Sequence, residues 1–548
     1  MTDNKQPELH PENISQSFSH DYSYDSLFVR TTPLEKLDEI KSMLLELPAG
    51  DDIIPLMKTA VEDWAPSHSF EEAGTVISVG DGIATVSGLQ GAAYGEILIF
   101  SGGIRGMVQE LHRSELGCIL LGDDSLVSQG SIVRRTGKMA GVPVGDEYLG
   151  RIINPLGLPI DGLGRIRASG YRLMESPAPG IIDRQPVNRP LETGLLAIDS
   201  MFPIGRGQRE LIIGDRQTGK TAIALDTILN QKNQDVVCIY VAIGQKASSV
   251  ARVVDVLKRQ GALEYTIVVN AGAGDPVSLQ YIAPYVGCAI GEYFMNSGRD
   301  VLIVYDDLSK HAAAYRTISL LLERSPGREA YPGDIFYLHS RLLERSAHLS
   351  DSLGGGSMTA LPIVETQAGD VSAYIPTNII SITDGQIFLE SELFFSGQRP
   401  AVNVGLSVSR VGGDAQTSAM KKAAGPIRLE LAQYREMEVF TQFSSDLDDA
   451  TKEQLKYGQG LMELLRQDQY HPLESWKQVV LLHAAMSKAI VLVPRQRIKK
   501  YADSLLGWIE LEQIELKDEI VNTGALSKES SELLRERIKE YTREFLAE

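Results

Sequence analysis

The spacing of apolar residues changes along the chain, and each spacing predicts a different kind of element. Between Pro33 and Pro48, apolar residues recur at steps of three or four with Glu and Lys between them, which predicts an amphipathic helix. A second short helix is expected over residues 53–64. Residues 1 to about 30 are polar and have no apolar period, which is typical of a flexible tail.

Short β-rich runs follow between Gly74 and Lys138. Four such runs stand at 75–79, 84–86, 96–100 and 119–121. Turn pairs such as Asp81-Gly82 separate them. Short strands that alternate with tight turns predict a small antiparallel β-barrel.

Strand and helix patterns alternate from about residue 140 to residue 416. The candidates for buried strands stand at 211–213, 236–242, 266–269 and 301–305. Such alternation predicts an α/β domain in which helices cover both faces of a parallel sheet. Beyond Ala424 the pattern is helical, with candidate helices at 428–440, 452–466, 476–489 and from Lys528 onwards.

Composition narrows the class of protein. The chain has 548 residues, which is too long for a single core and favours about three domains. It contains no apolar stretch long enough to span a membrane, and its polar, acidic start resembles neither a secretion signal nor a transit peptide, so a cytosolic bacterial protein is expected. The net charge of −19 argues against a general nucleic-acid binder. The three cysteines, at positions 118, 238 and 288, stand far apart among apolar residues, so buried reduced thiols are expected rather than a disulfide or a metal site.

The strongest motif is a phosphate-binding loop between the strand at 211–213 and a helical pattern. Its residues are Gly214, Asp215, Arg216, Gln217, Thr218, Gly219, Lys220 and Thr221. The glycines let backbone N–H groups approach phosphate oxygens, Lys220 supplies a positive charge, and the Thr221 hydroxyl can join the shell of a Mg²⁺ ion. A chance Gly-rich turn is the alternative, and the flanking strand and helix count against it.

A second part of the same chemistry stands at the end of the strand at 301–305. That strand is followed by Asp306 and Asp307, and a phosphate-loop enzyme needs such a carboxylate to hold Mg²⁺ through water. We assign this role to Asp306 and keep Asp307 as the second choice. Taken without the loop, the two acids would be an ordinary solvated strand end.

Two further positions bear on catalysis. The strand at 236–242 ends near Gln245, where a hydrolytic site commonly has a carboxylate, and an amide is a poor proton acceptor. This favours a site that binds nucleotide without rapid turnover. Arg410 precedes a Gly pair after a strand pattern and could project towards a γ-phosphate, although most Arg residues in such places are simply solvated.

Taken together, the motifs resemble the alpha subunits of F-type rotary ATP synthases. The resemblance runs from about Gly74 to the C-terminus. The runs that carry it are 203–210 into the phosphate loop, 241–248, 305–310, 326–329, 336–345, 365–372 and 407–413. In that family, alpha has Gln where the catalytic beta subunit has Glu, and Gln245 falls at this position. The segment before the barrel is longer here than is usual for the family, which bears on how the chain would dock on a peripheral stalk.

The resemblance implies a fold, a function and partners. The fold would be an N-terminal antiparallel β-barrel, a central α/β P-loop (RecA-like) nucleotide-binding domain and a C-terminal α-helical domain. With the extension, the expected regions are 1–70, 71–138, 139–416 and 417–548. The chain would be a regulatory, non-catalytic member of an alternating ring of three alpha and three beta subunits. The ring would contact a central-stalk gamma subunit and peripheral-stalk delta and b subunits, peripheral to the cytoplasmic face of the bacterial inner membrane. It would couple ATP synthesis to proton, or possibly sodium, translocation.

The resemblance also implies site residues. Mg-ATP would be held at the alpha site, and Arg410 would act as an arginine finger on the neighbouring beta site. The nucleotide contacts would be the phosphate loop with Arg206, Gln208 and Asp306, and at the adenine and the site wall Phe394, Arg399, Pro400, Gln467 and Gln469. Without the resemblance, the two glutamines would be read as a polar turn at a helix end.

Two other functions would fit the phosphate loop. One is a self-sufficient catalytic hexameric ATPase, which would need a base at or near position 245. The other is a ring-shaped RNA translocase of the same superfamily, which would need a basic and aromatic surface on the barrel. The acidic balance of the chain disfavours the translocase.

Overall fold

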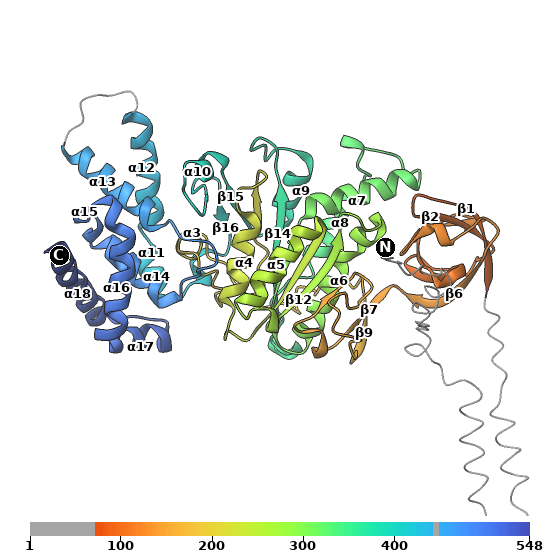
Figure 1. Ribbon diagram of the computed structural model, residues 1–548, viewed down its shortest axis with the longest axis horizontal. Helices are drawn as coiled ribbons and strands as arrows, with labels where there is room; N and C mark the ends of the chain where they lie inside the picture. Colours follow the sequence, from red (N-terminus) through yellow and green to blue (C-terminus); the bar gives the residue numbers. More distant parts are fainter. Residues whose placement is uncertain (1–71, 442–448, 548) are drawn as a thin grey trace, which may run out of the picture. The chain divides into compact units, whose positions relative to one another are not determined.

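The computed structural model describes residues 72–441 and 449–547 (Figure 1). The predicted tail and the two helices predicted before residue 65 lie outside these residues. The described part follows the predicted order of barrel, α/β sheet and helical region, so the predicted fold class is confirmed.

The barrel is a closed antiparallel sheet of six strands, with strand order β1-β2-β5-β4-β3-β6. Its strands are β1 (Ala73–Gly80), β2 (Ile83–Ser87), β3 (Glu96–Ile99), β4 (Arg105–Leu111), β5 (Glu115–Leu120) and β6 (Ile132–Met139). In β2, buried Ala84 and Val86 alternate with more exposed residues, as expected for a strand with one face on a core. The same core contains Cys118, whose thiol has a pKa raised by burial to about 12. All three cysteines are buried and none forms a disulfide, which confirms the expectation for them.

The central domain is built on an eight-stranded sheet with the order β16-β15-β10-β14-β13-β11-β12-β8. The bounds are β8 (Ile152–Ile153), β10 (Leu211–Gly214), β11 (Val236–Gln245), β12 (Thr266–Gly272), β13 (Asp300–Asp306), β14 (Ser357–Glu365), β15 (Gly385–Leu389) and β16 (Val408–Ser409). All neighbours run parallel except β16, which is antiparallel to β15. A separate pair joins β7 (Gly141–Val144) to β9 (Gly170–Leu173). Because β10 lies inside the sheet, the phosphate loop leaves it between two neighbouring strands.

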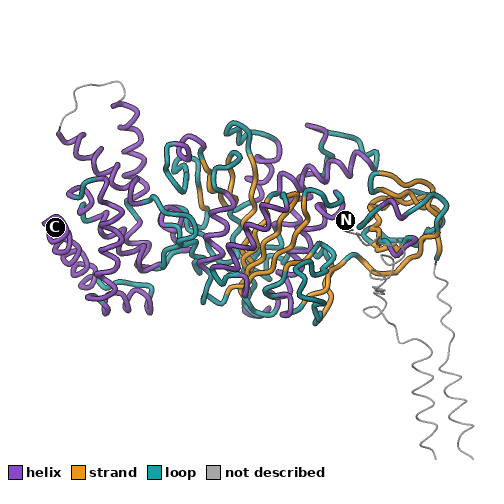
Figure 2. The backbone as a smooth tube through the Cα atoms, in the orientation of Figure 1, coloured by secondary structure: helices purple, strands orange, loops and turns teal. Residues whose placement is uncertain are grey.

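Helices pack on both faces of this sheet (Figure 2). Cys238 and Tyr240 of β11 share a core with α4 (Lys220–Asn230) and α5 (Ala247–Arg259). Val237 and Ile239, one residue out of step, share a different core with α6 (Val277–Asn296), α7 (Leu308–Leu321) and α8 (Ile335–Leu343). Successive residues of a strand point to opposite faces, so one apolar run supplies both cores.

The remaining residues form a helical region. Its helices are α11 (Ser418–Ala424), α12 (Ile427–Thr441), α13 (Asp449–Leu464), α14 (Ser475–Met486), α15 (Ala489–Leu492), α16 (Ile498–Glu512), α17 (Ile514–Thr523) and α18 (Lys528–Ala547). Trp476 and Leu505 belong to the same apolar core as α4 and α5, so the nucleotide-binding and helical regions share buried surface. Within the described residues, no helix combines the length and the apolar character that a membrane crossing requires.

Candidate nucleotide site

The phosphate loop runs from the end of β10 to the first turn of α4. Gly219, the residue before α4, has φ 97°, a conformation that glycine adopts at little cost. A side chain at Gly214 would place its Cβ 2.5 Å from the carbonyl oxygen of Leu389 on β15. The two glycines therefore allow the turn and the close packing of the loop against the neighbouring strand.

Lys220 opens α4 and is only 6% exposed. Its Nζ donates to the carbonyl oxygens of Gly214, at 2.9 Å, and Asp215, so the ammonium group lies inside the curve of its own loop. Desolvation lowers the pKa of Lys220, and the carboxylates of Glu365, Asp307 and Asp306 oppose that shift. The ammonium group is therefore a positive charge in a largely desolvated site, where it can pair with an anion.

Asp306 ends β13 and is bonded by three side chains. Its Oδ2 accepts from the hydroxyl groups of Thr221 and Tyr240, each at 2.7 Å, and its Oδ1 accepts from the Gln245 amide at 2.8 Å. Thr221 and Asp306 therefore present a hydroxyl and a carboxylate side by side. Oxygen donors of this kind are the ligands that Mg²⁺ prefers, so the residues present fit the ion.

Asp307, the second choice from the sequence, has a different task. Its Oδ1 accepts the backbone N–H of Lys310 at 2.8 Å, which caps α7, and its Oδ2 pairs with the Lys310 ammonium group at 2.9 Å. Burial raises the pKa of Asp307 to about 6. Asp307 does not line the cavity beside the loop, whereas Asp306 does.

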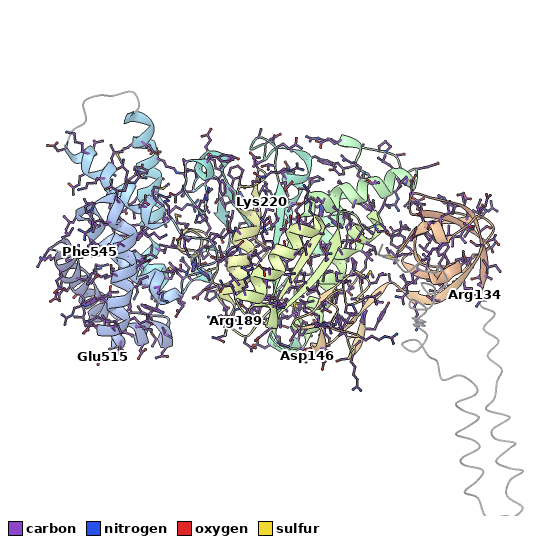
Figure 3. The ribbon with its side chains drawn as sticks, in the orientation of Figure 1. Arg134, Asp146, Arg189, Lys220, Glu515 and Phe545 are labelled. Carbon is purple, nitrogen blue, oxygen red and sulfur yellow. The ribbon has the colours of Figure 1, made fainter. Side chains whose placement is uncertain are left out.

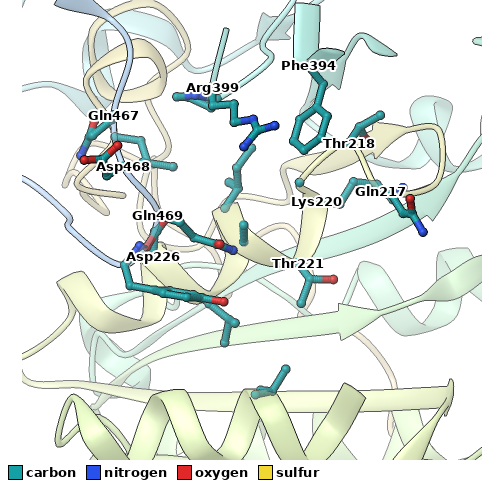
Figure 4. A pocket seen from close by; sticks show the side chains of 18 of the residues that line it. Gln217, Thr218, Lys220, Thr221, Asp226, Phe394, Arg399, Gln467, Asp468 and Gln469 are labelled. Carbon is teal, nitrogen blue, oxygen red and sulfur yellow. Dashed lines mark hydrogen bonds between the residues drawn. The ribbon is translucent and has the colours of Figure 1, made fainter. Parts of the chain in front are cut away.

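That cavity has a volume of about 1000 Å³ (Figure 4). It brings together eleven of the residues predicted for the site: Gln217, Thr218, Gly219, Lys220, Thr221, Asp306, Phe394, Arg399, Pro400, Gln467 and Gln469. Gln245 also lines it. Gln217 and Gln469, which are 252 residues apart in sequence, thus meet around one space, with the phosphate loop at one end and the segment that follows α13 at the other (Figure 4).

The cavity wall between the phosphate loop and the segment that follows α13 has the character of a site for a flat base. The Arg399 guanidinium lies over the Phe394 ring, 4.4 Å from its centroid, which forms a cation–π pair. The Gln467 amide is bonded to backbone groups: it accepts from Leu196 N–H at 3.1 Å and donates to the carbonyl oxygens of Gly194 at 2.7 Å and His471 at 3.0 Å. Gln467 therefore anchors this segment, while the more exposed Gln469 lines the cavity beside it.

Two predicted contacts are wrong and need correction. Arg206 forms an ion pair with Asp300, the first residue of β13, which also pairs with Arg189 at 2.8 Å. Since Asp306 is the last residue of β13, Arg206 lies at the opposite edge of the sheet from the phosphate loop; Figure 3 shows this separation between Arg189 and Lys220. Gln208 is fully buried and bonds Gly205, Glu210 and Ser409. Neither residue lines the cavity.

The other three predicted residues of the loop support it from outside the cavity. Gly214 packs on β15, as described above. The Asp215 carboxylate accepts from Thr366 at 2.6 Å and from Ser391 at 3.0 Å, which ties the loop to neighbouring segments. Arg216 is exposed and pairs with Glu365 at 3.1 Å.

Arg410 lies beyond β16, outside the cavity. Its backbone N–H donates to the carbonyl oxygen of Asp384 at 2.9 Å, and Ser409 pairs with Gly385, the first residue of β15. Arg410 is therefore at the edge of the sheet where the parallel strands begin. Its side chain is exposed and has no hydrogen bond or ion pair with any residue that the structure describes.

Several residues that line the cavity were not predicted from the sequence. They are Tyr240, which bonds Asp306, Glu365 at the end of β14, and Asp226 and Tyr470 at the far end. Glu365 stands in a run that carries the family resemblance, so a signal for it was present. Asp226 lies within an ordinary helical pattern, and only the fold brings it to the cavity.

The barrel, the nucleotide-binding domain and the helical region each match a model of a known protein family. Three family models match the chain: the "ATP synthase alpha/beta family, beta-barrel domain" over residues 70–137, the "ATP synthase alpha/beta family, nucleotide-binding domain" over 194–409 and the "ATP synthase alpha/beta chain, C terminal domain" over 416–541.

Curated relatives match across most of the chain. A protein named ATP synthase subunit alpha from Caldanaerobacter subterraneus subsp. tengcongensis is 58% identical over 497 residues, which is 91% of this chain and 98% of the relative. Proteins of the same name from Clostridium kluyveri and Clostridium botulinum are 57% and 56% identical over 498 residues, with 91% of this chain and 99% of each relative covered.

Proposed function

The chain belongs to the ATP synthase alpha/beta family, among its F-type alpha subunits, and on this premise we propose how its site works. The cavity binds ATP with Mg²⁺ and holds it without hydrolysing it rapidly. The observation that carries this proposal is the cluster of Lys220, Thr221 and Asp306 at one end of the cavity, with the Gln245 amide bonded to the same carboxylate. The relatives' names favour this function over the self-sufficient ATPase and the RNA translocase.

The phosphate end supplies binding. Lys220 pairs with the β- and γ-phosphates, and backbone N–H groups of the loop and of the α4 N-terminus face the same oxygens. Thr221 and Asp306 hold Mg²⁺, Asp306 through water, and the ion offsets phosphate charge when it is bound. Arg399 and Phe394 form the wall near the base, with Pro400, Gln467 and Gln469 around it.

The residue that limits catalysis at this site is Gln245. An amide orients water but accepts a proton poorly near neutral pH. Glu365 also lines the cavity, but its carboxylate forms an ion pair with Arg216. The nucleotide therefore stabilises the assembly more than it supplies energy.

The catalytic contribution of the chain comes from Arg410, acting on a neighbour. The position of Arg410 at the sheet edge opposite the phosphate loop, exposed and away from its own cavity, supports this role. In a ring where one subunit's opening edge meets the next subunit's phosphate loop, the guanidinium can stabilise charge on a transferring phosphoryl group.

The proposed assembly is a ring of three alpha and three beta subunits. It has a central-stalk gamma subunit, peripheral-stalk delta and b subunits, and no nucleic acid. The ring is peripheral to the cytoplasmic face of the bacterial inner membrane and couples ATP synthesis to proton, or possibly sodium, translocation. Within the chain we propose the regions 1–70, 71–138, 139–416 and 417–548 as extension, barrel, nucleotide-binding domain and helical domain.

The proposal is tested by equilibrium titration of the purified chain with Mg-ATP. Lys220→Ala removes the buried ammonium group, and we expect binding at least about tenfold weaker, since a hydrogen bond to a charged group contributes about 1.5–3 kcal/mol. Lys232→Ala, at an exposed position just after α4, is the matched control and should bind as the wild type does. Equal affinity in the wild type and in Lys220→Ala would overturn the assignment.

A further inference from the structure

A buried carboxyl group lies beside the far end of the cavity, and the proposed nucleotide contacts do not use it. Asp226 is on α4, is 3% exposed and lines the cavity together with Ala222, four residues earlier on the same helix face. At 1.5 Å per residue, Asp226 lies about 9 Å along the helix axis from Lys220. It therefore belongs to the base end of the site rather than to the phosphate end.

Asp226 holds a segment of the helical region. Its Oδ1 accepts the backbone N–H of Tyr470 at 2.7 Å, and no other described residue bonds its carboxylate. Tyr470 has φ 66°, a conformation that a non-glycine residue keeps only when its surroundings hold it. The bond from α4 is thus a restraint on the backbone next to Gln469.

The other side of this segment has its own anchor. The Gln467 amide is bonded to Gly194 and to Leu196, which opens α3 (Leu196–Met201), and Leu473 N–H donates to the Gly194 carbonyl oxygen at 2.8 Å. Gln469 is therefore held between two attachments, one at Gln467 and one at Tyr470. In Figure 4 the labelled side chains of Asp226 and Gln469 lie close together at the same end of the cavity.

We propose that Asp226 is a positioning residue that fixes Gln469 and Tyr470 against α4, so that recognition of the base depends on contact between the nucleotide-binding and helical regions. The inference rests on the proposed function in one respect, that the cavity holds a nucleotide with its triphosphate at Lys220. Removing the Asp226 carboxyl releases the segment at one side and leaves the phosphate loop unchanged.

The experiment compares two ligands on the full chain, each with Mg²⁺: ATP, and inorganic tripolyphosphate, which has no base. Asp226→Ala should weaken ATP binding about tenfold and change tripolyphosphate binding less than about twofold, as expected for loss of one hydrogen bond. Asp226→Asn keeps an acceptor oxygen and should restore ATP binding to within about threefold of the wild type. Asp255→Ala, at an exposed ion pair on α5, should alter neither ligand.

Two measurements keep the inference testable if Asp226→Ala folds poorly. Gln469→Ala, at an exposed position, should give the same selective loss of ATP affinity, and combining it with Asp226→Asn should add nothing beyond the single loss. Hydrogen exchange without nucleotide should show the Tyr470 amide protected in the wild type and in Asp226→Asn, and exposed in Asp226→Ala.

The outcomes separate the two proposals. If the wild type binds neither ligand, or if Lys220→Ala leaves both affinities unchanged, the proposed function fails. If Lys220→Ala weakens both ligands while Asp226→Ala weakens neither, or weakens both equally, the site is correct and the role of Asp226 is wrong.

Discussion

Burial raises the pKa of two carboxyl groups, Asp199 and Glu210. Asp199 is buried but accepts bonds from Thr193, Gly194 and Gln478. Glu210, also buried, accepts one bond from Gln208 at 2.7 Å, and its Oε1 has no partner among the described residues. Desolvation raises the pKa of Glu210 well above its usual value, which favours the neutral carboxyl group.

His339 shows the opposite shift. Both of its ring nitrogens lack a partner among the described residues, and burial lowers its pKa to about 3. Below pH 6.5, His339 is protonated in the unfolded chain but stays neutral in the folded chain. The free energy of unfolding therefore falls as the pH drops from about 6.5 towards 3. This loss amounts to about 1.4 kcal/mol per pH unit.

We therefore expect His339→Leu to lose about 2 kcal/mol less stability than the wild type between pH 6.5 and pH 5. Urea unfolding at the two pH values measures the difference. Comparison with a variant is needed because Asp226, whose pKa burial raises to about 7, shifts stability in the other direction. The matched control is His112→Leu, at an exposed barrel position. An unchanged acid dependence in His339→Leu would contradict the assignment.

At this scale the sequence was informative where chemistry is local. The phosphate loop and Asp306 were predicted because a Gly-rich turn and a strand end imply their own geometry. Arg206 and Gln208 were misplaced because spacing along the chain does not say at which sheet edge a side chain emerges. Asp226 was missed because its helix has nothing unusual in its sequence, and its partner stands 244 residues later.

Helix α6 packs closely on the sheet because two of its residues are glycines, which have no side chain. A Cβ at Gly287 would lie 2.4 Å from Cγ2 of Val241 on β11, and a Cβ at Gly291 would lie 2.7 Å from Sδ of Met358 on β14. The two glycines, one turn apart, let the helix approach the sheet closely. Both neighbours are buried, so neither can move aside easily.

This contrast predicts opposite effects from the same substitution. Gly287→Ala should destabilise the chain by about 1–3 kcal/mol through overpacking. Gly507→Ala on α16, where a Cβ would meet nothing within 4 Å, should stabilise it by about 0.5–1 kcal/mol through helix propensity. Thermal unfolding of the two variants beside the wild type measures the difference. A raised midpoint in Gly287→Ala would show that the close approach is not needed.

The elements themselves were predictable in proportion to their regularity. Four of the six barrel strands and the strands β10 to β13 coincide with predicted runs. The strands β4 and β14 were not predicted, because the apolar run of β4 is only Met107 and Val108, and Pro362 inside β14 argues against a strand. The two-residue strand β16 is too short to show a pattern of apolar and polar residues, although it directly precedes Arg410.

At the scale of the whole molecule, the cavity and Arg410 lie at opposite edges of the central sheet. The cavity stands where the parallel strands end, and Arg410 stands where they begin. The order of strands that creates this separation was not available from the sequence, which predicted a parallel sheet but not its neighbours. This separation is what the proposed function requires, because it leaves Arg410 free of the chain's own cavity and open to a neighbouring subunit.

We expect Arg410→Ala to leave nucleotide binding by the chain largely intact and to reduce multisite turnover of the assembled ring by about 10³- to 10⁵-fold, because the Arg stabilises charge on the transferring group. Turnover of the reconstituted complex and Mg-ATP titration of the chain measure the two effects. Arg259→Ala, an exposed residue of α5, serves as control and should change neither. Near-normal turnover in Arg410→Ala would remove the basis for a finger acting on the neighbour.

The closed barrel also has a consequence for how the chain is made. Its last strand ends at Met139, so the barrel can complete its ring of hydrogen bonds while the rest of the protein is still on the ribosome. A closed sheet presents no unpaired strand to other nascent chains on the same messenger RNA. Among the described domains the barrel is synthesised first, and its closed sheet offers no free edge for strand addition while the central sheet has yet to form.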